Sequence, residues 1–418
     1  MKITIHRGIN QIGGCITEIA TETTKIFIDL GHNLPKGDKP SEDKNANNEA
    51  IEKLTKDCNA IFYTHYHGDH IDLYKYVSGT VPQYIGEIAK QVMICKSKRL
   101  AKRPEITNVT EKDVETLETF KTFKAEDKIP IGDITVTPYF VSHSACDSYM
   151  FLIEAEGKKV LHTGDFREHG YLGKGLIPML ERYIAKRGID ILITEGTMLS
   201  RLQEKVIHEN DLKIKVKELM KKYKNIFVMC SSTDMERLAT FHAANMEINK
   251  RKPFVCDDFQ SDILDIFSKT AGEKTPLFRF KAYSFFEKNP KLINWIIDKG
   301  CCMLVRATEK FENYWDFLKP QLNTQETILI YSMWSEYINP NSRHAKKDYL
   351  NFVSKFPHIE KIHTSGHATA ETLTKVCELV NPKTAIIPIH SEHSADIFKL
   401  DISAELKEKI TLSPVFQF

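Results

Sequence analysis

Three histidines and an aspartate lie within six residues in the segment FYTHYHGDHID, residues 62–72. They follow an apolar run, AIFYTH, that is typical of a buried strand. Alternate residues of a tight loop that leaves a strand can converge on one point. We therefore expect His65 and His67 to reach one cation, and Asp69 and His70 to turn toward a second. Imidazole and carboxylate groups are ligands that suit zinc or manganese. The alternative, a polar surface loop, is disfavoured because this spacing rarely arises by chance.

Further candidate ligands stand at the ends of other apolar, strand-like runs: Asp29 in IFIDLG, His143 in FVSHSACD, Asp165 in VLHTGDF and His390 in AIIPIH. Strand ends at one edge of a sheet are where side chains from distant parts of a sequence meet. Each of these residues alone is more simply explained as a turn or cap residue. As an ordered set around the histidine-rich loop, they predict one metal-binding edge.

The elements that must position these residues begin with short β-rich runs, KITIHRG, CITEIA and KIFIDLG, separated by glycine and polar turns. Residues 134–166 have the pattern of three strands. Farther along, helix-like and strand-like segments alternate, starting with an amphipathic stretch near residues 203–223. This alternation is typical of βαβ units and predicts a parallel sheet. A polar segment at residues 31–48 has no assignment.

The composition is that of a globular protein, with 418 residues and 42% hydrophobic content. Lys plus Arg (58) nearly balance Asp plus Glu (56), so no overall field marks a polyanionic partner and any contact with nucleic acid must be local. The nine scattered cysteines are interpreted mostly as small core residues, and they predict a reducing compartment. With neither a signal peptide nor an apolar run of roughly 18 residues, we expect a cytoplasmic protein without a membrane partner.

The order Asp, His-x-His-x-Asp-His, His, Asp, His resembles the metallo-β-lactamase superfamily over essentially the whole chain. The resemblance implies an α/β fold, an αββα sandwich, that holds two divalent metal ions, with zinc expected first and manganese as the alternative. It implies that one metal is bound by His65, His67 and His143, that the other is bound by Asp69, His70 and His390, and that Asp165 bridges them. Asp29 would orient the histidine-rich loop without binding metal.

The long separation between Asp165 and His390 predicts an inserted α/β domain, residues 201–352, within a metal-binding domain made of residues 1–200 and 353–418. This arrangement resembles the β-CASP subfamily of RNA and DNA nucleases. The motifs LITEGT, HTSGHA, PIHSE and GDFR are most similar to those of ribonuclease J. Ribonuclease J carries a further C-terminal domain that is associated with oligomerisation, whereas this sequence ends soon after the last histidine, so the oligomeric state is left open.

The resemblance implies a ribonuclease in which a hydroxide activated by two metal ions attacks the phosphodiester. Exonuclease action from the 5′ end of single-stranded, 5′-monophosphorylated RNA is one form of this activity, and endonuclease action is the other. We expect His367 in HTSGHA to donate a proton to the leaving oxygen and Glu195 in LITEGT to hold its ring. Asp69 is included among the catalytic residues as well as the metal ligands.

Serines before two expected helices form a further candidate site. Ser365 and Gly366 precede one helix, and Ser231 and Ser232 precede another. Free N–H groups and the helix dipole favour an anion at such positions. In ribonuclease J such elements bind the 5′-terminal phosphate, so the resemblance implies a 5′-end pocket. The alternative is that these residues are simple N-caps.

Three other functions are kept as alternatives. A DNA nuclease of the same subfamily usually has valine where His390 stands, so this histidine favours RNA. A small-molecule ester or thioester hydrolase of the lactamase fold would need neither the long insertion nor HTSGHA. A non-catalytic RNA-binding scaffold would be expected to lose metal ligands, whereas every expected ligand is present.

Overall fold

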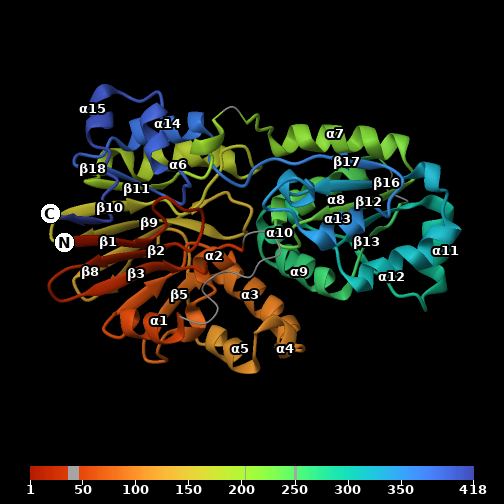
Figure 1. Ribbon diagram of the computed structural model, residues 1–418, viewed down its shortest axis with the longest axis horizontal. Helices are drawn as coiled ribbons and strands as arrows, with labels where there is room; N and C mark the ends of the chain where they lie inside the picture. Colours follow the sequence, from red (N-terminus) through yellow and green to blue (C-terminus); the bar gives the residue numbers. More distant parts are fainter. Residues whose placement is uncertain (36–46, 203, 249–251) are drawn as a thin grey trace. The chain divides into compact units, whose positions relative to one another are not determined.

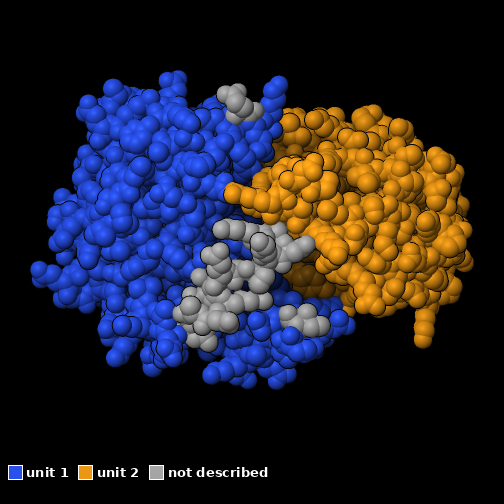
Figure 2. Space-filling model, viewed as in Figure 1, with its two compact units in different colours: residues 1–35, 40–206, 366–418 blue, residues 36–39, 207–365 orange. Residues whose placement is uncertain are grey.

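The computed structural model describes residues 1–35, 47–202, 204–248 and 252–418. Two compact units, coloured separately in Figure 2, divide these residues. Unit 2 comprises residues 207–365, and unit 1 contains the described residues before and after them. Both limits come later in the sequence than the boundaries expected at 200/201 and 352/353. The polar segment at residues 31–48 lies mostly outside the described residues.

Unit 1 is built on two sheets (Figure 1). The first has the strand order β19-β1-β2-β3-β4-β5-β6. Its strands are β1 (Lys2–Arg7), β2 (Ile16–Ala20), β3 (Lys25–Leu30), β4 (Ala60–Phe62), β5 (Gln83–Gly86), β6 (Lys121–Phe123) and β19 (Val415–Gln417). The second sheet has the order β18-β11-β10-β9-β8-β7. Its strands are β7 (Ile129–Ile131), β8 (Ile134–Val141), β9 (Ser148–Ala155), β10 (Lys158–His162), β11 (Ile191–Glu195) and β18 (Ala385–Ile389).

The two sheets of unit 1 share one hydrophobic core. Every second residue of a strand faces the same side, so Ile26 and Ile28 of β3 join Phe151 and Ile153 of β9 in this core. Helices cover the outer faces of both sheets (Figure 1). They are α1 (Asn47–Thr55), α3 (Glu87–Leu100), α4 (Pro104–Thr107) and α5 (Glu111–Glu118) beside the first sheet, and α6 (Leu176–Tyr183), α14 (Ala370–Val380) and α15 (Ala404–Glu408) beside the second. The resulting αββα sandwich confirms the predicted fold class.

Unit 2 has a parallel sheet in the order β14-β13-β15-β12-β16-β17. Its strands are β12 (Asn225–Cys230), β13 (Phe254–Cys256), β14 (Tyr283–Ser284), β15 (Cys301–Val305), β16 (Thr327–Ser332) and β17 (Ile359–Lys361). Its helices are α7 (Glu209–Lys222), α8 (Met235–Ile248), α9 (Asp258–Lys269), α10 (Ala271–Lys274), α11 (Pro290–Lys299), α12 (Glu309–Leu318) and α13 (Lys347–Val353). The parallel arrangement predicted from the alternating segments is confirmed.

Two local features of unit 2 differ from expectation. The helix expected near residues 203–223 begins only at Glu209. The C-terminal limit of the unit lies beyond residue 352 because β17 pairs with β16 and extends the parallel sheet. Thr364 then bonds to the backbone of Ile207, with its Oγ1 2.7 Å from the carbonyl oxygen, which joins the two ends of the unit. Within the described part of the chain, no helix is both long and apolar enough to cross a membrane.

The strand register in unit 1 brings distant residues to one edge. Strand β18 pairs in parallel with β11, so Glu195 lies beside Ile389, directly before His390. Strand β3 pairs in parallel with β4, with Ile28 beside Phe62, so the residues that follow each strand leave the sheet together. Carboxyl ends of parallel strands are a usual place for ligand sites. The candidate metal ligands and Glu195 therefore lie at the carboxyl ends of strands in both sheets of unit 1.

Candidate metal centre

The histidine-rich loop begins where β4 ends, and its last residues form the short helix α2 (Gly68–Ile71). Backbone contacts with the neighbouring strands fix this loop. The N–H of Cys15 donates to the carbonyl oxygen of Asp69 at 3.0 Å. A Cβ atom on Gly31 would lie only 1.7 Å from the same oxygen, so the close approach of β3 requires glycine there.

The first group of candidate ligands consists of His65, His67 and His143. One ring nitrogen of each lies within 4.8 Å of those of the other two. His143 Nε2 is 3.1 Å from His67 Nδ1. The other nitrogen of His143, Nδ1, is 2.6 Å from the carbonyl oxygen of Gly366 and donates to it, which leaves Nε2 to face the group. All three rings therefore face one point, as a shared cation requires.

Asp165 lies at the centre of the cluster. Its Oδ2 is 3.2 Å from His70 Nε2, 3.7 Å from His390 Nε2, 3.9 Å from His143 Nε2 and 4.0 Å from His65 Nε2. Asp69 Oδ2 lies 3.1 Å from His390 Nε2, on the side of the second group. One carboxylate thus adjoins both groups of imidazoles, which is the position that a bridging ligand needs.

Asp29 supports the loop from beneath. Its carboxylate accepts hydrogen bonds from the Thr64 N–H at 2.7 Å, the Thr64 hydroxyl at 2.8 Å and His70 Nδ1 at 2.7 Å. Asp29 and His390 both have positive φ, 62° and 53°. Such conformations cost about 1–3 kcal/mol and persist where surrounding contacts hold them. The contacts of Asp29 are those of a residue that orients its neighbours.

The protonation and bonding of the cluster fit divalent cations. Burial lowers the pKa of His65, His67 and His143, in the case of His67 to about 4, so these rings are neutral and can donate lone pairs. His65 Nε2 and His70 Nε2 are buried without a hydrogen-bond partner among the described residues. An unmet buried polar atom costs about 1–3 kcal/mol. A bound cation would give both nitrogens a partner.

Glu195 and His367 form a pair beside Asp165. Glu195 Oε2 is 3.0 Å from His367 Nδ1, and its Oε1 accepts from the N–H groups of Phe166 at 3.0 Å and Ala368 at 3.2 Å. Burial acts to lower the pKa of His367. The charges of Glu195 and Asp165 outweigh burial, so the pKa is raised. The pair therefore favours a protonated imidazole at the edge of the cluster.

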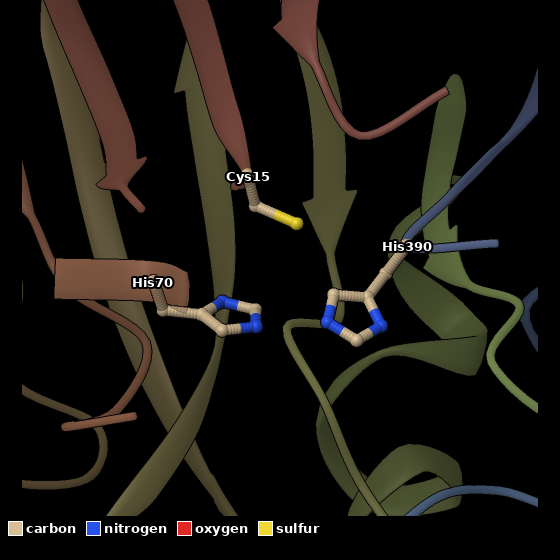
Figure 3. Close-up of side chains that lie close together, drawn as sticks. All are labelled: Cys15, His70 and His390. Carbon is tan, nitrogen blue, oxygen red and sulfur yellow. The ribbon is translucent and has the colours of Figure 1, made fainter. Parts of the chain in front are cut away.

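Two residues of the site were missed from the sequence. Thr197 follows Glu195 in LITEGT, and its Oγ1 lies 2.7 Å from His390 Nδ1 and 3.1 Å from His367 Nδ1. Cys15, interpreted as a small core residue, lies within 4.8 Å of ring nitrogens of both His70 and His390 (Figure 3). Burial raises the pKa of its thiol. The pair Gly13-Gly14 before Cys15 was the available signal of an unusual backbone at this point.

The serine pocket stays a prediction. Ser231, Ser232 and Ser365 belong to unit 2, whereas Gly366 belongs to unit 1. Ser232 Oγ is 3.2 Å from Arg306 Nη1, a cationic neighbour. The N-cap alternative is wrong for Ser365, because Thr369 caps α14 and accepts from the N–H of Thr372.

Comparison with known proteins places the chain in a family. The Beta-lactamase superfamily domain model matches residues 40–225, which include the histidine-rich loop, His143 and Asp165. The Zn-dependent metallo-hydrolase RNA specificity domain model matches residues 357–414. The chain belongs to the metallo-β-lactamase superfamily. This metallo-β-lactamase superfamily member is also similar to proteins named ribonuclease J, which supports the predicted likeness to ribonuclease J and the β-CASP subfamily.

Ribonuclease J of Helicobacter pylori (strain ATCC 700392 / 26695) is 23% identical over 416 residues, covering 94% of this superfamily member and 56% of the relative. Ribonuclease J of Mycoplasma genitalium is 22% identical over 415 residues, covering 94% and 68%. The chain thus spans about half the length of the Helicobacter relatives. A solved structure of a protein of unknown function from Enterococcus faecalis V583 shares the fold, with a TM-score of 0.70, 20% identity and coverage of 94% and 95%.

Proposed function

We propose that this metallo-β-lactamase superfamily member is a ribonuclease that hydrolyses RNA phosphodiesters with two divalent metal ions. The observation that carries the proposal is the single buried cluster in which Asp165 adjoins both groups of imidazoles and the Glu195–His367 pair. RNA as the substrate is supported by the match to an RNA specificity domain and by the names of the relatives.

The residues that would hold the metals are His65, His67 and His143 for one ion, Asp69, His70 and His390 for the other, and Asp165 for both. Their nitrogen and oxygen donors suit zinc best, with manganese as the alternative. When bound, the ions supply an acidified water and stabilise negative charge on the phosphate oxygens. The protein contributes a dry, fixed set of donors, because most of these side chains are buried.

His367 is proposed to donate the proton to the leaving oxygen. Its Nδ1 faces Glu195 and Thr197, so proton exchange with the substrate takes place at Nε2. Glu195 is a positioning residue, because two backbone N–H groups fix its carboxylate and it raises the pKa of His367. A raised pKa keeps the ring protonated near neutral pH, as a general acid needs.

The finer form of the proposal is 5′-to-3′ exonuclease action on single-stranded RNA with a 5′-monophosphate. Ser231, Ser232, Ser365 and Gly366 would bind that phosphate, as the likeness to ribonuclease J implies. The scattered cysteines favour a reducing compartment such as the cytoplasm for this activity.

The test compares three substrates: a 5′-monophosphorylated RNA, the same RNA with a 5′-hydroxyl, and the matching DNA. Each is incubated with zinc- or manganese-loaded protein and with His65→Ala as the control. Release of mononucleotides from the monophosphorylated RNA alone supports both the ribonuclease and the 5′-end pocket. Internal cuts in both RNAs support the ribonuclease and reject the exonuclease form. Cleavage of DNA alone favours the DNA nuclease, and no cleavage by metal-loaded protein overturns the proposal and directs attention to small esters.

The role of His367 has its own test. The His367→Ala protein should bind the same number of metal ions and turn over at least about 100-fold more slowly, because general acid catalysis contributes that much or more. Metal content is measured on the same sample as the rate. Full turnover by the metal-loaded variant would remove the assignment.

A further inference from the structure

Cys15 is the one sulfur donor in the metal-ion groupings found among the described residues. It stands directly after Gly13 and Gly14, both with positive φ, and before β2. Figure 3 shows its sulfur pointing into the space between the rings of His70 and His390. The sulfur and one nitrogen of each ring lie within 4.8 Å of one another. Cys15 is 1% exposed, so it is buried together with the rings.

The backbone around Cys15 is tied to both histidines. The N–H of Cys15 donates to Asp69, the residue before His70, at 3.0 Å. The N–H of His390 donates to Gly8 at 2.8 Å, and a Cβ atom on Gly8 would lie 3.5 Å from the Cys15 sulfur. The backbone positions from which the sulfur and both rings extend are therefore fixed by the fold.

The two histidines point independently to a cation at this place. His70 Nδ1 is bonded to Asp29 at 2.7 Å, so its Nε2 faces the cluster, where it is buried 3.2 Å from Asp165 Oδ2 without forming a hydrogen bond in the described structure. His390 Nδ1 is bonded to Thr197 at 2.7 Å, so its Nε2 faces the same space. Two imidazoles fixed by second partners are the usual preparation of metal ligands. The sulfur shares the space that both rings face.

We propose that Cys15 Sγ is a ligand of the cation that His70 and His390 bind. The proposal rests on the metal centre of the proposed function and deepens it. On binding, a sulfur–metal bond replaces the S–H bond, and the proton passes to solvent. The two metal positions then differ in chemistry, because His65, His67 and His143 offer only nitrogen. A thiolate favours zinc or cobalt over manganese and magnesium, so the sulfur-containing position selects zinc.

The test titrates the metal-free protein, residues 1–418, with Co²⁺. A thiolate bound to cobalt gives a charge-transfer band in the near ultraviolet that nitrogen and oxygen ligands do not give. We expect this band in the wild type and in the Cys377→Ala control, and its loss in Cys15→Ala and Cys15→Ser. Cys377 is a matched control because it is fully buried in the core of unit 1, on the inner face of α14. Bound cobalt is counted in every sample.

A second measurement needs no variant. X-ray absorption of the zinc-loaded wild type should show a sulfur neighbour at about 2.3 Å besides nitrogen and oxygen at about 2.0–2.2 Å.

Loss of the sulfur in Cys15→Ser should weaken binding of one zinc ion by at least about 10-fold, since even the partners of metal ligands contribute that much.

The outcomes separate this proposal from the proposed function. Cobalt bound without the band, a band that survives in Cys15→Ala, or zinc with only nitrogen and oxygen neighbours would each overturn the role of Cys15. Failure to bind any cobalt would overturn it together with the metal centre. A cysteine-dependent band in a protein that cleaves no RNA would uphold Cys15 as a ligand and reject only the ribonuclease.

Discussion

Each unit contains a buried cluster of ionisable side chains, and the two clusters differ in whether their polar atoms have hydrogen-bond partners. In unit 2, Arg237 is surrounded by acceptors: its Nε and Nη2 lie 3.0 and 2.8 Å from Glu209 Oε1, and its Nη1 lies 2.7 Å from Ser332 Oγ. Thr240 completes the network by donating to Glu209 at 2.8 Å. In unit 1, by contrast, the buried nitrogens His65 Nε2 and His70 Nε2 lack hydrogen-bond partners within the described structure.

This difference distinguishes a structural cluster from a binding cluster. A buried charge is tolerated when an opposite charge and hydrogen-bond acceptors of the same protein pair with it, and Glu209 pairs with Arg237 in this way. The imidazoles of unit 1 are instead held by second partners on their far sides, such as Asp29 and Gly366, while their near sides are left to each other. The satisfied network stabilises unit 2 without a ligand, whereas the donors of the unit 1 cluster are arranged as divalent cations would need them.

Metal loading should give the largest contrast between the units. With zinc at about 1,000 times its dissociation constant, the free energy of unfolding of unit 1 should rise by about 4 kcal/mol, because zinc binds only the folded cluster. The urea dependence of alkylation at buried Cys377 reports unit 1. All three tryptophans, Trp295, Trp315 and Trp334, lie in unit 2, so their fluorescence reports that unit. An equal rise in both signals would contradict the separation.

Breaking the network between Arg237 and Glu209 should lower the unfolding free energy of unit 2 by a similar amount. In Glu209→Gln the charge of Arg237 stays buried without its carboxylate, so we expect a loss of roughly 3 kcal/mol in the unfolding free energy of unit 2. Tryptophan fluorescence during urea unfolding measures it. Glu218→Gln on the exposed side of α7 is the control, since its pairing with Lys221 is at the surface and should be worth little. Equal stability of the two variants would show that the network is dispensable.

Replacing Glu195 in the unit 1 cluster should instead lower the rate of RNA hydrolysis. In Glu195→Gln the ring of His367 loses the charge that raises its pKa, so kcat on RNA should fall by about 100-fold. The alkaline limb of the pH–rate profile should move to lower pH, with KM and bound metal unchanged. A purely structural role for Glu195 would lower the amount of folded protein without moving that limb.

Acidification of the metal-free protein should give a contrast that builds up gradually as the pH falls. Burial lowers the pKa of four histidines in unit 1: His65, His67, His143 and His162. In unit 2 His242 has a lowered pKa, about 4. Because unfolded histidine has a pKa of about 6.5, the unfolded chain binds more protons below that pH, and stability falls by up to about 1.4 kcal/mol per pH unit for each group.

Unit 1 should therefore lose stability faster than unit 2 between pH 6.5 and about 4. The raised pKa values of His70 and His367 act above pH 6.5, so they do not offset this loss. Cys377 alkylation and tryptophan fluorescence at several pH values measure the two slopes. His162→Gln should remove one group's share from the slope of unit 1, and equal slopes in both units would contradict the expectation.

The αββα fold and the positions of the histidine-rich loop could be predicted because their signals are local. Alternating apolar residues specify the strands, and a ligand directly after a strand must lie at the sheet edge. The arrangement around Asp165 is harder to foresee, because it depends on the pairing of β11 with β18, which come from distant parts of the sequence. The grouping of ligands around Asp165 was predicted from the family resemblance, because hydrophobic periodicity does not indicate which distant strands pair.

Cys15 shows where sequence reasoning fails. In CITEIA a cysteine before a strand has the same pattern whether it packs in a core or faces a metal. Only the hydrogen bond from its N–H to Asp69 and the glycine at position 31 place it at the cluster. The C-terminal limit of unit 2 is hard to foresee for a similar reason: β17 is short and exposed, so no apolar run indicates that it extends the parallel sheet.

The insertion of unit 2 between β11 and β18 has a consequence for biosynthesis. The ribosome makes His65, His67, Asp69 and His70 early, but His390 only after all of unit 2. Domains generally fold as they emerge, N-terminal parts first. A nascent chain therefore lacks β18 and the complete set of donors while it is still attached to its messenger RNA. The set of donors in the candidate metal centre is therefore incomplete until all of unit 2 and β18 have been made.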